Sequence, residues 1–437
     1  MKFLLNIILL SFLCVFFAGC SEHSSQKKGN QRNVTEQLNK LGQLQLEEYR
    51  HSSYYRVLEE IPKHIKQVEN LSVFRGDSNA PFSAQLVPLQ TYGKTGEYYL
   101  TKVEWLTVDD KRRVIIADRG SNYALTLHVF NDDGTYRTPL GRPGRGPGEY
   151  LEPFFLQGNV GRVYLYDVTG MRINAYNIDD YSIFKTSPEE RWDIRNEKDI
   201  QGFRLGGMKV RNDGKILVEF YKPSLNEVSS RSKSTYLLMD LDGNSLDFKP
   251  FTFYGNLRIV TEKNYPFPNI FPIGRTLTAM SSEGELFAAN TQEFLIKKYN
   301  PNGIYQSAFY YPIEGSSLDF EEFLKSGRKF GPSIPKIDEV KKAFKDIDEE
   351  LPKTSPVIDK LMVDDENRIW VAVPIGAKSN IYEWWILNSS GKLLAKLLLP
   401  RDQPIYDIKN GYLYSKKVDE ETGAEYVVKY RLELTEN

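Results

Sequence analysis

Gly148-Glu149-Tyr150 repeats a motif that the chain has already used once, as Gly96-Glu97-Tyr98. A second pair repeats with it, because Pro88-Leu89 returns as Pro139-Leu140. Both offsets are about 51 to 52 residues, which is the length of one blade of a β-propeller. Each Gly-Glu-Tyr stands just before a predicted first strand, so the two copies mark equivalent points of successive blades.

The same period continues along the chain. Short segments rich in β-branched and aromatic residues alternate with turns of Gly, Asn, Asp and Ser, which supply positive φ in hairpins. Turns between a first and a second strand recur about every 45 to 55 residues where nothing is inserted, near Asp110, Gly161, Gly214, Gly284, Glu366 and Asn410. Six such turns predict an all-β, six-bladed β-propeller.

The repeat of Pro88-Leu89 as Pro139-Leu140 also predicts how the ring closes. It makes Ala84–Leu89 a fourth, outer strand equivalent to Tyr136–Leu140. The last blade, built from 412–415 and 425–434, draws only three strands from the C-terminus. We therefore expect the N-terminal strand to complete that blade, which would remove two free sheet edges.

The run Arg142-Pro143-Gly144-Arg145-Gly146-Pro147-Gly148-Glu149-Tyr150 and the turn Phe130-Asn131-Asp132-Asp133-Gly134 before it carry a family likeness. Together they resemble the six-bladed β-propeller lipoproteins of Bacteroidota, which are similar in turn to the NHL and TolB-like propellers. The resemblance covers roughly residues 80 to 434. It implies a propeller and a lipid anchor, and it implies no particular reaction.

The N-terminus has the pattern of a lipoprotein signal peptide. A charged start and an apolar stretch end at Phe17-Ala18-Gly19-Cys20, where the Cys20 thiol would be alkylated with diacylglycerol. The alternative is an uncleaved transmembrane anchor, but Asn6 and Ser11 interrupt the stretch, which is shorter than the ~20 residues of a spanning helix.

These assignments divide the chain into three parts. Residues 1–19 are the predicted signal peptide, 20–80 a lipidated tether with a helix within about 35–70, and 81–437 the propeller. The expected location is the outer membrane of a Gram-negative envelope, lipid-anchored on the periplasmic side or at the cell surface.

Composition limits the partners and the chemistry. The 57 basic and 58 acidic residues are balanced and unclustered, so no nucleic-acid partner is expected. The only cysteines are Cys14, which leaves with the signal, and Cys20. Of the four histidines, only His128 lies in the repeated body, where we expect it on a strand face. We therefore predict no cofactor and no transition-metal site, and calcium is the one ion left open.

Long insertions point to one face of the ring. They fall at 140–153, 187–203, 253–275 and 311–355, and each joins an outer strand to the next inner strand. In a four-stranded blade these crossings share one face, here called the long-loop face. The opposite side is the plain face. Binding groups gather on long loops carried by a rigid scaffold.

Four residues of the first long loop form the candidate site: Arg142, Arg145, Glu149 and Tyr150. On a structural interpretation, the loop is a tight passage between blades in which Glu149 caps a neighbouring loop. On a functional one, Arg142 and Arg145 offer planar donors to a carboxylate or phosphate. None of the four is expected to fill a strand core.

Other motifs have structural and functional interpretations side by side. An amphipathic helix from Ile337 to Leu351 would form a lid over the long-loop face, or pack flat on blades four and five. The adjacent Trp384 and Trp385 point to opposite faces of a strand and would fill the core or offer a sugar platform. Asp109-Asp110 and Asp364-Asp365 occupy equivalent turns, where they would serve turn chemistry or calcium.

These observations favour an envelope lipoprotein that binds a ligand or partner protein on its long-loop face and is not an enzyme. The rival is a lyase or hydrolase acting on glycan or peptide at the propeller channel. Such an enzyme would have to use carboxylates, Tyr, Lys or Arg, because the body lacks the histidines of a metal site.

Overall fold

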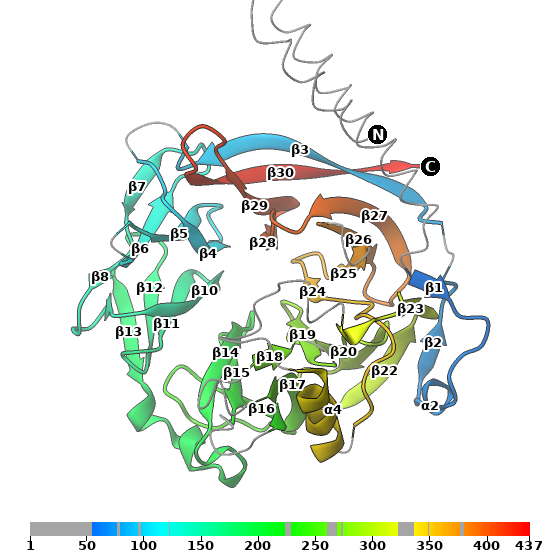
Figure 1. Ribbon diagram of the computed structural model, residues 1–437. Helices are drawn as coiled ribbons and strands as arrows, with labels where there is room; N and C mark the ends of the chain where they lie inside the picture. Colours follow the sequence, from blue (N-terminus) through cyan, green and yellow to red (C-terminus); the bar gives the residue numbers. More distant parts are fainter. Residues whose placement is uncertain are drawn as a thin grey trace, which may run out of the picture. The chain divides into compact units, whose positions relative to one another are not determined.

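Six antiparallel units of four strands make up the body (Figure 1). Two are separate sheets, two carry a fifth strand, and the last two are joined through β3 into one sheet of eight strands. In this computed structural model the described residues are 55–76, 79–94, 98–121, 123–222, 229–259, 269–271, 274–321, 336–347, 349–375 and 380–437. All of them belong to one unit, Tyr54–Asn437. The predicted signal peptide, Cys20 and most of the predicted tether lie outside the described residues.

The first three blades are built in chain order. Blade 1 contains β4 (Val103–Val108), β5 (Val114–Arg119), β6 (Leu125–Phe130) and β7 (Tyr136–Pro139). Blade 2 contains β10 (Pro153–Asn159), β11 (Arg162–Asp167), β12 (Arg172–Asn177) and β13 (Ile183–Pro188). Blade 3 contains β14 (Arg204–Val210), β15 (Ile216–Tyr221), β16 (Ser229–Met239) and β17 (Phe251–Ile259), with β18 (Asn269–Phe271) added at its edge.

The next three blades complete the set. Blade 4 contains β19 (Thr276–Met280), β20 (Leu286–Asn290), β21 (Leu295–Tyr299) and β22 (Tyr305–Tyr310). Blade 5 contains β24 (Lys360–Val363), β25 (Ile369–Ile375), β26 (Ile381–Leu387) and β27 (Leu393–Pro400). Blade 6 contains β28 (Ile405–Lys409), β29 (Tyr412–Val418), β30 (Glu425–Glu436) and, from the other end of the chain, β3 (Phe82–Tyr92).

The predicted closure is confirmed. β3 pairs antiparallel with β30 along its length, with Leu86 opposite Leu432, and its first residue pairs with β27 of blade 5. β28 of blade 6 contacts β4 of blade 1, so the sheets meet around a ring with the first strands innermost. The edge that β30 would otherwise present is covered by the N-terminal strand.

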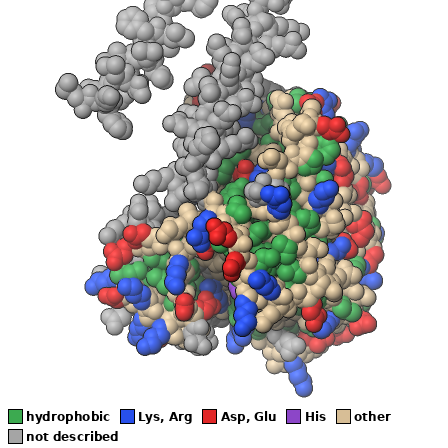
Figure 2. Space-filling view, turned by 90° about the vertical axis from the view of Figure 1, so that its right-hand side faces the viewer, with side chains coloured by type: hydrophobic (Ala, Val, Ile, Leu, Met, Phe, Trp, Pro, Cys, Tyr) green, Lys and Arg blue, Asp and Glu red, His purple; other side chains and the backbone are tan. Residues whose placement is uncertain are grey.

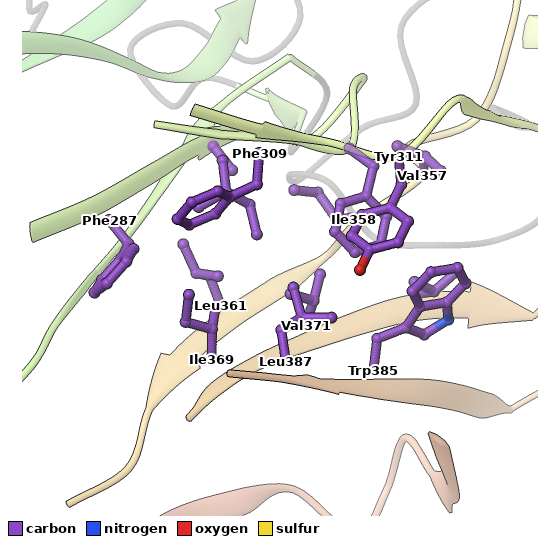
Figure 3. Packing of buried hydrophobic residues seen from close by; sticks show 14 of the residues in the cluster. Phe287, Phe309, Tyr311, Val357, Ile358, Leu361, Ile369, Val371, Trp385 and Leu387 are labelled. Atoms are coloured by element: carbon purple, nitrogen blue, oxygen red, sulfur yellow. The ribbon is translucent and has the colours of Figure 1, made fainter. Parts of the chain in front are cut away.

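One hydrophobic cluster lies between each pair of neighbouring blades, which makes six in all. Strand alternation explains them, since successive side chains point to opposite faces of a sheet. Trp384 lies in the cluster between blades 5 and 6, and Trp385 in the one between blades 4 and 5, as predicted for core residues. Figure 3 shows the latter cluster, where Trp385, Tyr311 and Phe309 meet side chains from β25.

Part of the predicted tether belongs to the body. β1 (Tyr55–Val57) pairs with β23 (Ile313–Gly315), and β2 (Leu71–Val73) adds a parallel strand outside β22. Within the described residues of the predicted helix range, only α2 (Lys63–Lys66) is helical. Ile65, on α2, is fully buried against blade 4 and explains why this segment packs rather than remaining a free tether.

The predicted helix near Ile337 is present as α4 (Ile337–Asp346), but its placement on blades 4 and 5 is wrong. Its buried Val340 and Phe344 pack with Leu257 of β17, in blade 3. Arg231 of β16 binds both carboxylate oxygens of Glu349, just beyond the helix, at 2.5 and 2.6 Å. Among the described residues, no helix is long and apolar enough to cross a membrane.

Candidate functional site

The loop singled out by the sequence is held partly by hydrogen bonds between its own residues. Arg142 donates from Nε to Glu149 Oε1 at 2.7 Å, and Glu149 Oε2 accepts the Gly146 amide at 2.7 Å. These donors hold the pKa of the Glu149 carboxyl below its usual range. Glu149 therefore caps its own loop rather than a neighbouring one.

The four predicted residues do not converge on one site. Tyr150 is 1% exposed and lies in the core between blades 1 and 2, so the expectation that it is not a core residue is wrong. Burial raises the pKa of its hydroxyl to about 12. The side chains of Arg142 and Arg145 are exposed, and Arg145 makes no side-chain hydrogen bond or ion pair with a described residue.

Arg172, which the sequence analysis missed, organises this loop. From β12 it donates to the carbonyl oxygens of Arg145, Gly144 and Glu149, at 2.7, 3.1 and 2.8 Å. It also forms an ion pair with the fully buried Asp167 at 3.3 Å. The loop thus closes over a buried arginine of blade 2, which supports the structural interpretation of its glycines and prolines.

A cavity of about 440 Å³ lies among the innermost strands, within the usual range for small-molecule sites. The first strands of five blades contribute to it, together with the second and third strands of blade 3. Its lining residues are Trp105, Leu106, Phe154, Phe155, Leu156, Gly206, Gly207, Met208, Lys209, Leu217, Glu219, Tyr236, Thr278 and Tyr406.

Of two adjacent glycines in β14, Gly207 leaves part of this space open, whereas a Cβ on Gly206 would lie 2.9 Å from the Tyr221 ring. Gly206 and Gly207 stand at a bulge in the first strand of blade 3, where other first strands carry Trp105, Phe154 and Tyr406. A Cβ on Gly207 would meet only Glu219, at 3.4 Å, so the space beside it is open. Glycine inside a strand weakens it and often marks a position where another group approaches closely.

Opposite the glycines the wall is aromatic. Trp105 and Phe154 pack edge to face with ring centroids 6.1 Å apart, and Phe154 is 40% exposed. Tyr406 donates to the Val103 carbonyl at 3.1 Å, which holds its ring in place. Burial raises the pKa of Tyr406 above its usual range, so its hydroxyl stays protonated.

The cavity also holds two oppositely charged side chains on the face of blade 3 that turns toward blade 4. Glu219 of β15 stands opposite Gly207 and Tyr236, and Lys209 stands opposite Leu217. Burial lowers the pKa of the Lys209 ammonium, an effect that the nearby Glu219 carboxylate partly offsets. The pocket therefore combines apolar walls with a few polar groups, as ligand sites do.

Cross-blade hydrogen bonds narrow the channel toward the plain face. Gln157 of β10 both donates to and accepts from the Val210 backbone, at 3.0 and 2.8 Å. Lys409 of β28 reaches Asp110 and the carbonyls of Val108 and Gly158 at 2.8 to 3.1 Å. Lys209 is next to Val210, so Lys209 and Glu219 lie toward the end of the channel that these hydrogen bonds join. Phe154 lies toward the long-loop face.

The paired aspartates serve the turns. Asp109 accepts the amides of Lys111 and Arg113, and Asp364 accepts those of Glu366 and Arg368. Their neighbours join blades, since Asp110 accepts the Gly161 amide and Asp365 the Asn410 amide.

His128 lies in the body as expected, on β6, and is 5% exposed. Its Nε2 is 2.6 Å from the Tyr98 hydroxyl and 2.8 Å from Thr126 Oγ1, and burial lowers its pKa to about 4. Within the described ranges, no group of three or more His, Cys, Asp or Glu side chains is placed to hold a metal ion.

The cavity residues were missed because strands far apart in sequence assemble them. One local signal was available, namely Gly206-Gly207 in the segment just before the predicted turn at Gly214, followed two residues later by Lys209. A lysine and a glycine pair in an otherwise apolar strand pattern indicate a position that does not fill the core.

Several solved structures are similar to this chain at low identity. A Bacteroides fragilis protein described as presumed exported is 16% identical, covering 83% of this chain and 99% of that one, with a TM-score of 0.45. A PQQ-bound aldose sugar dehydrogenase from Streptomyces coelicolor is 14% identical over 81% and 100%, with a TM-score of 0.40. An inactive virginiamycin B lyase from Staphylococcus aureus with quinupristin is 13% identical over 80% and 88%, with a TM-score of 0.33.

With such low identities and TM-scores, the similarity gives no information about activity. No curated protein matches the chain. Residues 63–200 match the model of a family described as a 6-bladed beta-propeller, DUF5128. That range begins on α2 and spans blades 1 and 2, so it includes the Gly-Pro loop and the segment that packs on blade 4. The chain is a six-bladed β-propeller that over these residues is similar to the DUF5128 family.

Proposed function

We propose that this protein is a ligand-binding propeller of the bacterial envelope, lipid-anchored through Cys20, which takes a small ligand in its central cavity. The observation that supports binding is the cavity itself, which is walled by aromatic rings and open beside Gly207. A strand gains no stability from a glycine at this position, so the space beside Gly207 is better explained by a ligand than by packing.

The cavity favours a small molecule over a macromolecule as the primary ligand. Figure 2 shows lysine and arginine side chains interspersed with aspartate and glutamate over one side of the molecule, without a field of one sign among the described residues. This pattern agrees with the balanced composition and gives no support to a polyanionic partner. The exposed Arg142 and Arg145 are proposed as secondary contacts for a partner or a longer ligand.

Filling the cavity tests the proposal. Gly207→Leu adds a side chain that meets only the movable Glu219 at its Cβ, so the fold should survive. A matched control is Gln85→Leu, on the exposed side of β3. We would measure thermal shifts with a library of amino acids, short peptides, mono- and oligosaccharides. Compounds that stabilise the wild type and the control but not Gly207→Leu support a cavity site.

A catalytic role is the second candidate, supported by Lys209, Glu219 and Tyr236 in one apolar pocket. A lysine with a lowered pKa beside a carboxylate can exchange protons with a bound substrate. The test is to incubate each stabilising compound with the protein and follow it by mass spectrometry. Turnover that disappears in Lys209→Met but persists in Gln85→Leu would replace the binding role with an enzymatic one.

A further inference from the structure

Lys209 and Glu219 line the cavity without an ion pair to any described residue, in contrast to three lysines of blade 6. Lys409 pairs with Asp110, Lys416 with Glu425 and Lys429 with Asp132, at 2.5 to 2.8 Å. Neither Lys209 nor Glu219 forms an ion pair with any described residue, although each feels the other's charge. Glu219 interacts with the Tyr236 hydroxyl, but neither charged group contacts a counter-ion among the described residues, so each can pair with an opposite charge on a ligand.

The register of β14 and β15 sets their separation. Lys209 lies opposite Leu217 and Gly207 opposite Glu219, so the two charged residues are diagonal neighbours on one face of the sheet. Diagonal neighbours in an antiparallel pair are about 7 to 8 Å apart. Both residues line the same cavity, so a ligand of amino-acid or dipeptide size can reach both.

Ligand charge decides which molecules suit this pair. An anion would be attracted by the Lys209 ammonium but repelled by the Glu219 carboxylate. A cation would be attracted by Glu219 but repelled by Lys209. A neutral molecule would leave both charges without a counter-charge. A molecule that carries both signs satisfies both groups with charge-assisted hydrogen bonds, which are about twice as strong as neutral ones.

We infer that the cavity binds a zwitterion, namely a free amino acid or dipeptide with an apolar side chain. Its carboxylate lies on Lys209, its ammonium on Glu219, and its side chain against Trp105, Phe154 and Tyr406. The inference rests on the proposed cavity function and adds to it the chemical class of the ligand. It is independent of the Gly-Pro loop and of the lipid anchor.

Calorimetric titration with matched probes tests the class. The probes are L-phenylalanine and glycyl-L-phenylalanine, each with two analogues of nearly the same size. The N-acetyl form lacks the ammonium, and the amide form lacks the carboxylate. We expect at least one zwitterion to bind about tenfold or more tightly than both of its own analogues, because each lost charge contact is worth about that factor.

Variants separate the two contacts. Lys209→Met should weaken the zwitterion but not the amide, which has no carboxylate to lose and is no longer repelled by the Lys209 ammonium. Glu219→Gln should weaken the zwitterion but not the N-acetyl form, which is no longer repelled by the Glu219 carboxylate. Lys342→Met, on the exposed face of α4, is the matched control and should change none of the three affinities. Melting curves of each variant report whether the fold is retained.

The outcomes distinguish failure of the zwitterion inference from failure of the proposed cavity function. If the analogues bind within threefold of both zwitterions, or if only saccharides bind in a manner that Gly207→Leu abolishes, the zwitterion class is wrong and the cavity function stands. If no library compound distinguishes the wild type from Gly207→Leu, the cavity function itself fails, and the inference fails with it.

Discussion

Arg172 shows how one buried side chain can fix a loop whose own charged residues are exposed. Its guanidinium is 8% exposed and satisfies three carbonyl oxygens of the Gly-Pro loop while pairing with Asp167. Arg142, in the loop itself, is 80% exposed and makes one ion pair with Glu149. Burial therefore assigns the structural role to Arg172, although the sequence motif draws attention to Arg142.

This contrast predicts unequal costs for two arginine substitutions. Arg172→Ala should lower the free energy of unfolding by about 3 to 5 kcal/mol, because it leaves a buried carboxylate without its partner. Arg142→Ala serves as the matched control and should shift the melting temperature by less than about 2 °C. Calorimetry of both variants checks the prediction. A melting temperature lowered by Arg142→Ala as much as by Arg172→Ala would assign the structural role to the loop arginine as well.

His128 predicts a defined pH dependence of stability. Its pKa of about 4 in the folded state lies below the unfolded value of 6.5, so between these values the unfolded chain binds one more proton. Stability should therefore fall as the pH drops through this window and level off below it. Linkage gives a loss of about 2 kcal/mol between pH 7.5 and pH 5 from this residue.

The measurement compares urea unfolding of the wild type and of His128→Asn at the two pH values. Carboxylates contribute to both proteins, so the difference between their pH slopes isolates the histidine. Equal slopes in the two proteins would show that His128 keeps an ordinary pKa, and that the packing of Tyr98 against it does not exclude water.

Among the elements, β3 carries the ring closure. Truncation to residue 92 removes β3 and exposes the inner-facing Val428 and Tyr430 of β30, along with the edge of blade 6. Truncation to residue 34 leaves every described strand in place. We expect the first to lower the melting temperature by more than about 10 °C and the second to leave it within about 2 °C.

A third truncation, to residue 80, separates closure from edge packing. It removes β1, α2 and β2, which add an outer strand to blade 4, a pair with β23 and the buried Ile65, but no strand of the six blades. Its melting temperature should lie between those of the other two variants. If loss of residues 1–80 already costs as much as loss of 1–92, the N-terminal segment and not β3 closes the structure.

Sequence periodicity predicted the elements that repeat and missed those that occur once. Blade pitch, the six turns and the role of 84–89 follow from a pattern that each blade must satisfy to bury its faces. β1 and β2 pair with outer edges in registers that no repeat announces. α4 was recognised by its apolar stripe, but a stripe does not say which surface it covers, so its site on blade 3 had to come from the structure.

The candidate site was not predicted because it also occurs only once and is assembled from several blades. Its residues come from blades 1, 2, 3, 4 and 6, and each strand contributes between one and four of them. No local spacing connects Trp105, Glu219 and Tyr406 in the sequence. The glycines of the conspicuous Gly-Pro loop have a backbone role instead. The chain turns tightly there as it passes between blades, which needs residues with positive φ such as Gly144 and Gly148.

For the whole molecule, the remaining prediction is lipid anchoring through Cys20. The motif Phe17-Ala18-Gly19-Cys20 predicts cleavage before Cys20 and diacylglyceryl modification of its thiol. Cys20→Ser should release the protein from the membrane fraction, because acyl chains contribute about 0.8 kcal/mol of membrane affinity per buried methylene group. Cys14→Ser is the matched control, since that cysteine leaves with the signal peptide and its loss should not change fractionation.

Fractionation and intact-mass measurement together test this anchor. The wild type and Cys14→Ser should yield a mature chain that starts at Cys20 with added lipid mass, and both should sediment with membranes. Cys20→Ser should lack that mass and move to the soluble fraction. An uncleaved, unmodified N-terminus in the wild type would instead support a transmembrane anchor. The cavity function would be unaffected by that result, because every residue that lines the cavity lies between Trp105 and Tyr406.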